Sequence, residues 1–295
     1  MMQNNQAIPF NKENFKLIFS KEFALVVIIS IPSAIVAEFF NIPLAWFLGP
    51  MLITSIASLM GLKTKMPKLV LSSILILLGL YIGNYIDKSL FSQMHQWAFT
   101  SLIMLVYIIV SVLIVSKYLQ IFSKYGRKTS IFSAAPGALG PLMILAEDEK
   151  SDLSQVATSH LIRLIIIITI FPFIVNSLYD VENVKIAEEI IKNQNIFHLI
   201  LLIISSITLI IIFDKFRIPA ALLSGTLFAS GFLQISEIAS YQFPPNIIDY
   251  CLLILGASVG CRFANKTFGE IARNALHSFV ATFLLVVLGL LAALA

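Results

Sequence analysis

The sequence contains few charged residues. Only 12% of its 295 residues are charged, whereas a soluble domain averages about 25%. Hydrophobic residues make up 58% of the chain, and the mean hydropathy is +0.92. This composition excludes an ordinary soluble domain and predicts a protein that lies in the lipid bilayer.

Cysteine and histidine are also scarce. Cys251 and Cys261 each lie in or beside an apolar segment, so neither a disulfide framework nor a metal pair is indicated. A monooxygenase would need clustered metal ligands, typically several histidines. The four histidines are instead scattered, at His95, His160, His198 and His277. We therefore expect no enzyme activity, no metal and no cofactor.

The sequence also lacks a polar region long enough to form a DNA-binding domain. Its isoelectric point near 9.0 comes from basic residues in the loops between apolar stretches. A transcription factor needs a basic domain that can reach a groove of the nucleic acid. We therefore expect no nucleic-acid partner.

Long apolar stretches are abundant. A hydrocarbon core of about 30 Å is crossed by roughly 20 apolar residues in a helix, and shorter stretches can be tilted or interrupted helices. Nine stretches qualify as spans: 23–40, 44–59, 69–86, 98–118, 156–178, 196–213, 220–233, 247–259 and 275–295. No good cleavage site for a signal peptide follows the first stretch, so we interpret it as a retained span.

One further apolar stretch, residues 130–146, is interrupted by Pro136, Gly137, Gly140 and Pro141. Each proline removes a backbone donor and clashes with the preceding turn, and each glycine adds backbone freedom. Irregular backbone at membrane depth is tolerated only where protein buries it or where it lines a wet cavity. These four residues are therefore the first candidates for a substrate-binding site.

Basic residues in the loops predict the orientation, because cytoplasmic loops carry the excess of Lys and Arg. If residues 130–146 enter and leave on one side, 16 basic residues share the side of the N-terminus and 3 lie opposite. If the stretch crosses the bilayer, the counts become 12 and 7. The loop charges thus favour a re-entrant segment and a cytoplasmic N-terminus.

The two halves of the chain are similar when one is laid over the other. Residues 42–49 align with residues 218–225, and Pro67 aligns with Pro244. Matched prolines and glycines are more specific than matched apolar residues, so they indicate an internal duplication. The matched glycines are Gly79 and Gly83 in the first half and Gly256 and Gly260 in the second. Their spacing of four favours close helix packing over a binding role.

The predicted fold is an all-α polytopic membrane protein with about nine transmembrane helices, one re-entrant segment and two inverted repeats. Its predicted parts are a cytoplasmic tail at 1–21, a first repeat at 22–178, a surface linker at 179–195 and a second repeat at 196–295. The second repeat is expected to be truncated, because Ala295 aligns with Tyr118 and no second Pro-Gly loop follows. Either the chain is shortened or another subunit supplies the partner loop.

The helix after the interrupted segment carries a polar stripe. Ser151 or Asp152 is its expected N-cap. Asp152, Gln155, Ser159 and Arg163 follow at spacings of 3, 4 and 4, so they share one face. An arginine this deep costs about 3 kcal/mol or more unless it finds a partner. Arg163 either binds an anionic group of a substrate or counters a carboxylate, or it ties down backbone carbonyls of the re-entrant loop.

Two more residues complete the predicted site. His160 lies beside the stripe and is either a hydrogen-bonded packing residue or a proton relay. Glu38, at the end of the first span, is either an ordinary interfacial charge or the acid that meets Arg163. The candidate substrate-binding residues on this helix are therefore Ser159, His160 and Arg163.

These motifs resemble the membrane AbrB family, some of whose members are labelled ammonia monooxygenases. The resemblance lies in the segment Ile42 to Pro50, its echo at Ile218 to Gly225, the Pro-Gly loop with its acidic turn, and the helix of Arg163. It implies a duplicated protein of the bacterial inner membrane that is associated with regulation of gene expression. A likeness to inverted-repeat transporters, whose re-entrant hairpins bind substrate, is an analogy at the level of the fold.

Two functions remain open. The first is a secondary-transporter-like solute carrier with the Pro136 loop and Arg163 at its site. The second is a membrane-embedded regulator or scaffold without transport activity. Besides the lipid bilayer, the candidate partners are a small anionic solute and further copies of the chain in a homo-oligomer.

Overall fold

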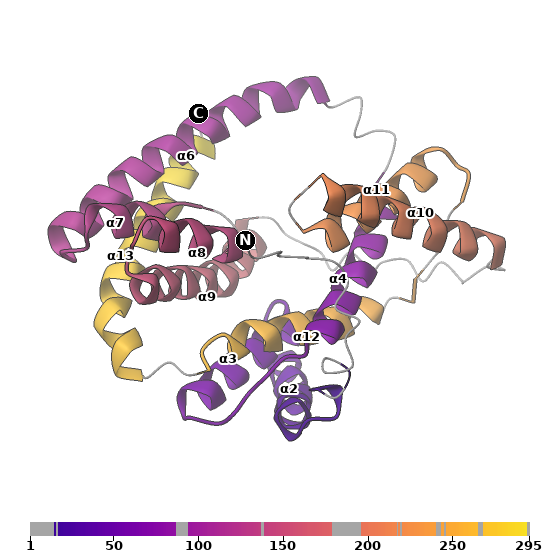
Figure 1. The fold of residues 1–295 in the computed structure, drawn as a ribbon, viewed down its shortest axis with the longest axis horizontal. Coiled ribbons are helices and arrows are strands. Elements are labelled where there is room, and N and C mark those ends of the chain that lie inside the picture. The colour runs from indigo at the N-terminus through magenta and orange to yellow at the C-terminus, as the bar shows by residue number, and fades with distance from the viewer. Residues whose placement is uncertain are drawn as a thin grey trace. The chain divides into compact units, whose positions relative to one another are not determined.

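The structure is a computed structural model that describes residues 15, 17–86, 94–136, 139–178, 196–216, 218, 220–239, 243–244, 246–264 and 268–293. The regular structure in this part of the chain is helical (Figure 1). The helices are α2 (Lys21–Phe39), α3 (Ala45–Leu59), α4 (Lys68–Gly83), α6 (Met94–Phe122), α7 (Arg127–Ala134), α8 (Leu139–Asp148), α9 (Leu153–Leu178), α10 (Ile196–Lys215), α11 (Ala221–Ile235), α12 (Ile247–Cys261) and α13 (Phe268–Ala293).

Five of the described helices contain a stretch long and apolar enough to cross a membrane. These stretches are Lys21–Phe39, Phe99–Phe122, Leu153–Phe173, Ile196–Lys215 and Ala275–Ala292. Four shorter apolar helices, α3, α4, α11 and α12, correspond to the other predicted spans. Lipid offers no hydrogen-bond partners, so an apolar chain satisfies its backbone internally as helix. The predicted helical membrane protein is confirmed, and the number of crossings stays a prediction.

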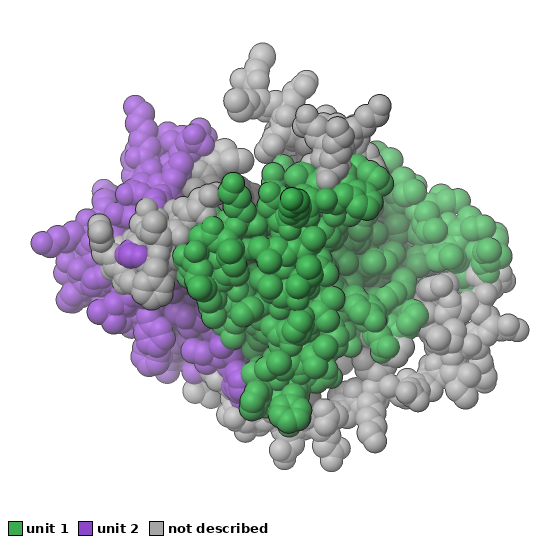
Figure 2. Space-filling model, turned by 90° about the horizontal axis from the view of Figure 1, so that it is seen from below, with its two compact units in different colours: residues 1–91, 180–265 green, residues 92–179, 266–295 purple. Residues whose placement is uncertain are grey.

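The chain forms two compact units, and each takes helices from both halves of the sequence (Figure 2). Unit 1 comprises residues 1–91 and 180–265 and therefore contains α2, α3, α4, α10, α11 and α12. Unit 2 comprises residues 92–179 and 266–295, with α6, α7, α8, α9 and α13. The predicted surface linker, residues 179–195, lies outside the described residues.

In unit 1, α4 packs closely on α11. A Cβ atom added at Gly79 or Gly83 would come within 3 Å of the backbone of α11. The hydroxyl of Ser230 on α11 also donates a hydrogen bond to the carbonyl of Leu80 at 2.9 Å. Glycine allows this approach, and the hydroxyl then reaches the neighbouring backbone.

Helix α12 packs on α3 in the same way. In this contact the glycines belong to a helix of the second half of the sequence and the facing backbone belongs to the first half. A Cβ atom added at Gly256 or Gly260 would come within 3 Å of the backbone of α3. The hydroxyl of Thr54 on α3 lies 3.3 Å from the carbonyl oxygen of Ala257, in the position that Ser230 has against Leu80, and 2.6 Å from the carbonyl oxygen of Pro50 in its own helix. The close packing predicted for all four glycines is thus confirmed.

The helices α3 and α11 also begin alike. Leu44 precedes α3 with φ 51° and ψ 43°, and Ala220 precedes α11 with φ 52° and ψ 44°. Neither residue caps its helix with a side-chain hydrogen bond. The left-handed region is uncommon for residues other than glycine. Its occurrence at two positions that the alignment pairs shows that the aligned sequences adopt the same local structure.

Unit 2 has its own apolar core. Buried residues from α6, α7, α13 and the α6–α7 connection form it: Val115, Leu119, Tyr125, Ala134, Ala281 and Leu285. Helix α9 packs on α7, α8 and α13. The interrupted segment is therefore held between long helices of its own unit.

Candidate functional site

The interrupted segment consists of two short helices. Helix α7 ends at Ala134, and Ala135 is already extended, with φ −59° and ψ 132°. A residue before proline is disfavoured in the helical region, so Pro136 accounts for this end. Helix α8 begins at Leu139, which places Gly140 and Pro141 in its first turn, where proline is tolerated. Pro136 is exposed, and Gly137 lies outside the described residues.

Arg163 contacts the end of α7. One terminal nitrogen of its guanidinium donates to the carbonyl of Ala135 at 3.1 Å, and the other donates to the carbonyl of Ser133. The last carbonyls of a helix have no partner within that helix, so the arginine satisfies two of them. This is the contact expected if Arg163 ties down the loop backbone. Binding of a substrate by Arg163 stays a prediction.

His160, one turn before Arg163, holds the same segment. Its Nε2 lies 2.9 Å from the carbonyl oxygen of Phe132, and the residue is only 8% exposed. A carbonyl oxygen can only accept, so Nε2 carries the proton and donates it. The contact is that of a hydrogen-bonded packing residue, and a proton relay at His160 stays a prediction.

The start of α9 is fixed against the start of α7. Oδ1 of Asp152 accepts a hydrogen bond from the backbone N–H of Gln155 at 3.0 Å, so Asp152 is the N-cap. The N–H of Asp152 in turn donates to the hydroxyl of Thr129 at 3.1 Å. Of the two residues predicted as N-cap, the structure selects Asp152. The two helices therefore meet near this cap and again at Arg163.

Ser159 connects α9 to α13. Its hydroxyl oxygen lies 3.4 Å from that of Ser278, and both residues are buried. Two more buried hydroxyls lie in this unit. Tyr125, on the connection between α6 and α7, is buried, and burial raises its pKa. The hydroxyl of Ser133, on α7, is buried without a hydrogen-bond partner among the described residues. Sequence reasoning missed Tyr125, Ser133 and Ser278, because isolated hydroxyls in apolar stretches give no signal of a shared location.

Glu38 belongs to unit 1. Its Oε2 accepts a hydrogen bond from Nε1 of Trp46 at 3.2 Å. The ring of Trp46 also meets the ring of Tyr250 edge to face, with centroids 6.4 Å apart. Trp and Tyr near the ends of spans are typical of the membrane interface, which fits the ordinary interfacial role of Glu38. Its pairing with Arg163 stays a prediction.

Comparison with known proteins supplies the family. The family model described as "Transition state regulatory protein AbrB" matches residues 2–83 and 46–295. A protein of Escherichia coli (strain K12) named "Putative regulator AbrB" is 20% identical over 225 residues. The match covers 76% of this chain and 64% of that relative, so the chain spans less than two thirds of its length. No solved structure matches.

The two matches to the family model show the family of this chain, because together they extend over nearly the whole sequence. The second match alone, residues 46–295, includes the interrupted segment, the helix of Arg163 and all four paired glycines. The chain therefore belongs to the membrane AbrB family that its motifs resemble.

Proposed function

We propose that this protein is a secondary-transporter-like carrier of a small solute, with the Pro136 loop and Arg163 at its site. The observation that carries the proposal is the contact between Arg163 and the end of α7. A cation within an apolar helix and an interrupted backbone are each unfavourable in lipid. Broken helices of this kind form the substrate sites of many secondary transporters.

The solute is proposed to be a small anion. The first N–H groups of α8 have no partner within the helix, and the N-terminus of a helix attracts negative charge. A guanidinium has five N–H donors, of which the two carbonyls of Ser133 and Ala135 engage two. Remaining donors of Arg163 and the start of α8 would both favour an anionic group. Ser159 and His160 would then line the same site from α9.

Two inverted repeats are part of the proposal. When the first half of the sequence is aligned with the second, α3 corresponds to α11 and α4 corresponds to α12. The contact of α4 with α11 therefore corresponds to the contact of α12 with α3. Such a correspondence is expected of two repeats related by a twofold axis. The two matches to the family model also overlap, at residues 46–83, as expected of a duplicated sequence. The loop charges support opposite orientations of the repeats, which is a recurrent plan of transporters.

The proposed location is the bacterial inner membrane, with the N-terminus in the cytoplasm. The excess of Lys and Arg in alternate loops supports this orientation. We further propose that the protein is not an enzyme, binds no nucleic acid and acts through its solute. A carrier can alter gene expression by changing the level of an inducer, so transport is compatible with a regulatory role.

Solute flux in proteoliposomes tests the proposal. The wild-type protein and the variant Arg163→Ala are reconstituted, and uptake of a panel of small acids and amines is measured. We expect the wild type to carry one class of small acid and Arg163→Ala to lose that flux. Lys128→Ala is the matched control, because it removes a cation from the exposed start of α7.

A membrane-embedded regulator without transport activity is the second candidate. The observation in its favour is the name of the Escherichia coli relative, which describes a regulator. Absence of flux for every solute of the panel, with folded wild-type protein in the vesicles, would favour this candidate. If flux persists unchanged in Arg163→Ala, the protein is a transporter but Arg163 is not part of its substrate site.

A further inference from the structure

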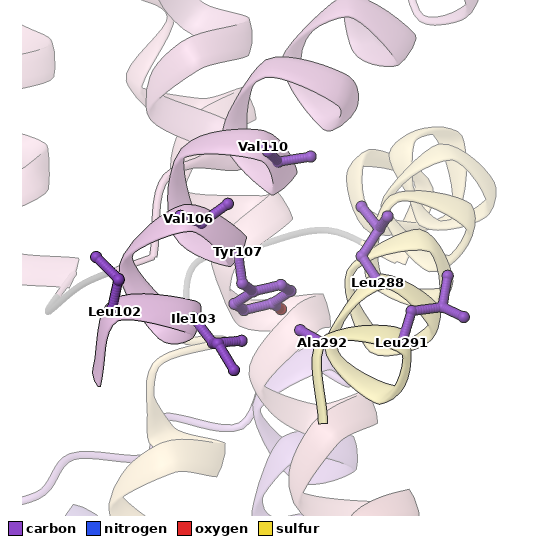
Figure 3. Close-up of a pocket in the computed structure, with 8 residues that line it drawn as sticks. All are labelled: Leu102, Ile103, Val106, Tyr107, Val110, Leu288, Leu291 and Ala292. Carbon is purple, nitrogen blue, oxygen red and sulfur yellow. The ribbon is translucent and has the colours of Figure 1, made fainter. Parts of the chain in front are cut away.

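An apolar groove lies between α6 and α13 of unit 2 (Figure 3). Its volume is about 430 Å³, and eight residues line it, five from α6 and three from α13. The α6 side extends from Leu102 to Val110, which is roughly 12 Å of helix at 1.5 Å per residue. Both walls remain accessible, since Val106 is 54% exposed and Leu291 is 59% exposed. The groove is therefore long, open and apolar.

The groove contains a single hydroxyl, and that hydroxyl is already bonded. Tyr107 directs its ring into the space between the two helices (Figure 3). Its OH donates a hydrogen bond to the carbonyl of Leu285 at 3.0 Å. An occupant therefore needs no polar group, because nothing in the lining would be left without a partner. A volume of this size is within the range of ligand pockets, about 300 to 1,000 Å³.

The surroundings of the groove identify the occupant. Both walls belong to apolar stretches long enough to cross a membrane, Phe99–Phe122 and Ala275–Ala292. In the bilayer such a groove opens on hydrocarbon, and an empty groove would lose dispersion contacts along its whole lining. A flexible hydrocarbon chain matches the length and the apolar surface of the groove.

We propose that the groove binds an acyl chain of a membrane phospholipid as a site distinct from the general lipid surface. The inference depends on the membrane location of α6 and α13 and is independent of solute transport. Val106 is the wall residue chosen for substitution, because it lines the groove and is not itself buried. Ile109, on the same helix, is also 54% exposed but does not line the groove.

Photolabelling of the full-length protein tests the site. The protein is reconstituted in vesicles of phosphatidylethanolamine and phosphatidylglycerol that contain a phospholipid with a photoactivatable acyl chain. Labelled residues are then mapped by mass spectrometry of peptides. We expect label to gather on the groove residues of α6 and on the stretch from Leu288 to Ala292 of α13.

The variant Val106→Trp should fill the groove. An indole would occupy the space that the acyl chain needs beside α13, so labelling of α13 should be largely lost. Ile109→Trp is the matched control and should leave the labelling unchanged. Leu102→Trp, at another exposed wall position, replaces Val106→Trp if that variant is not obtained folded.

Three outcomes would overturn the proposal. Label spread evenly over α6, including Ile109, would indicate general contact with the bilayer. Unchanged labelling in both groove-filling variants would exclude the groove as the site. A wild-type dimer that Val106→Trp converts to monomer, with no lipid label in the groove, would show that a second copy of the chain covers it.

Discussion

The two units hold their helices together by different means. In unit 1, small residues let helix backbones approach closely, and the contacts of Gly79 and Ser230 recur at Gly256 and Thr54. In unit 2, the end of a short helix is held by the side chain of Arg163. The first arrangement depends on glycines that leave room for the neighbouring backbone, and the second depends on one partly buried charge. The difference predicts that unit 1 is sensitive to added volume, whereas unit 2 is sensitive to the loss of one cation.

The largest expected effect comes from added volume in unit 1. A valine at Gly256 would place its Cβ within 3 Å of the backbone of Phe47, and neither backbone can move freely. We expect Gly256→Val to lower the free energy of unfolding by about 3 kcal/mol, as overpacking does in protein cores. Thermal unfolding in detergent and the yield of monodisperse protein measure this loss.

The control for this variant is Gly269→Val on α13. A Cβ atom there would have no neighbouring atom within 4 Å. A loss of stability in Gly269→Val as large as that in Gly256→Val would contradict the packing argument.

Removing the charge at Arg163 should destabilise unit 2 alone. In Arg163→Met the carbonyls of Ser133 and Ala135 lose their donors, which costs about 1–3 kcal/mol for groups left unsatisfied. Hydrogen exchange of α7 should therefore become faster, while exchange of α3 and α12 stays as in the wild type. Lys128→Met, which removes an exposed cation from α7, serves as the control. Equal acceleration in both units would show that the two are not independent.

A smaller loss of stability is expected when either of two corresponding hydroxyls of unit 1, those of Thr54 and Ser230, is removed. Ser230→Ala removes a hydrogen bond to the backbone of a neighbouring helix, and Thr54→Val removes a hydroxyl that shares its proton between such a contact and the carbonyl of Pro50 in its own helix. Hydrogen bonds between membrane helices average about 0.6 kcal/mol, so both variants should lose a similar, small amount of stability. Ser73→Ala is the control, since the hydroxyl of Ser73 donates to the carbonyl of Leu69 within its own helix. Clearly unequal losses would weaken the correspondence between the two contacts.

The smallest effect is expected at the surface of unit 2. Nζ of Lys128 lies 2.6 Å from Oε2 of Glu149, with both side chains more than half exposed. Water and salt screen such a pair, so Lys128→Ala should change stability by less than about 0.5 kcal/mol. Thermal unfolding at low and high ionic strength measures the change. A loss as large as that of Arg163→Met would show that the two backbone partners of Arg163 are not what distinguishes the two cations.

Much of the fold could be predicted from local features. Apolar runs predict the helices because the membrane leaves the backbone no other partner, and Pro136 predicts the end of α7 because proline restricts the residue before it. The N-cap at Asp152 follows from a side chain that bonds its own helix. Each of these features acts over a few residues, so the sequence displays it directly.

The partners in the candidate site could not be predicted. The sequence marks Arg163 as needing a partner but leaves open a substrate, a carboxylate or the loop backbone. The structure pairs it with the carbonyls of Ser133 and Ala135, which lie far earlier in the chain, on the other side of α8. Ser278 reaches Ser159 across 119 residues. Contacts of this range depend on how helices pack, and many packings satisfy the same apolar pattern.

The sequence by itself determined the membrane class, the positions of the helices, the interruption at Pro136 and the pairing of glycines between the two halves. These properties follow from hydropathy and from the local restrictions of proline and glycine. Only the tertiary structure decided which helices the glycines bring together and which groups Arg163 binds. It also decided that residues from both halves of the chain share each unit, because such contacts arise from the fit between whole helix surfaces.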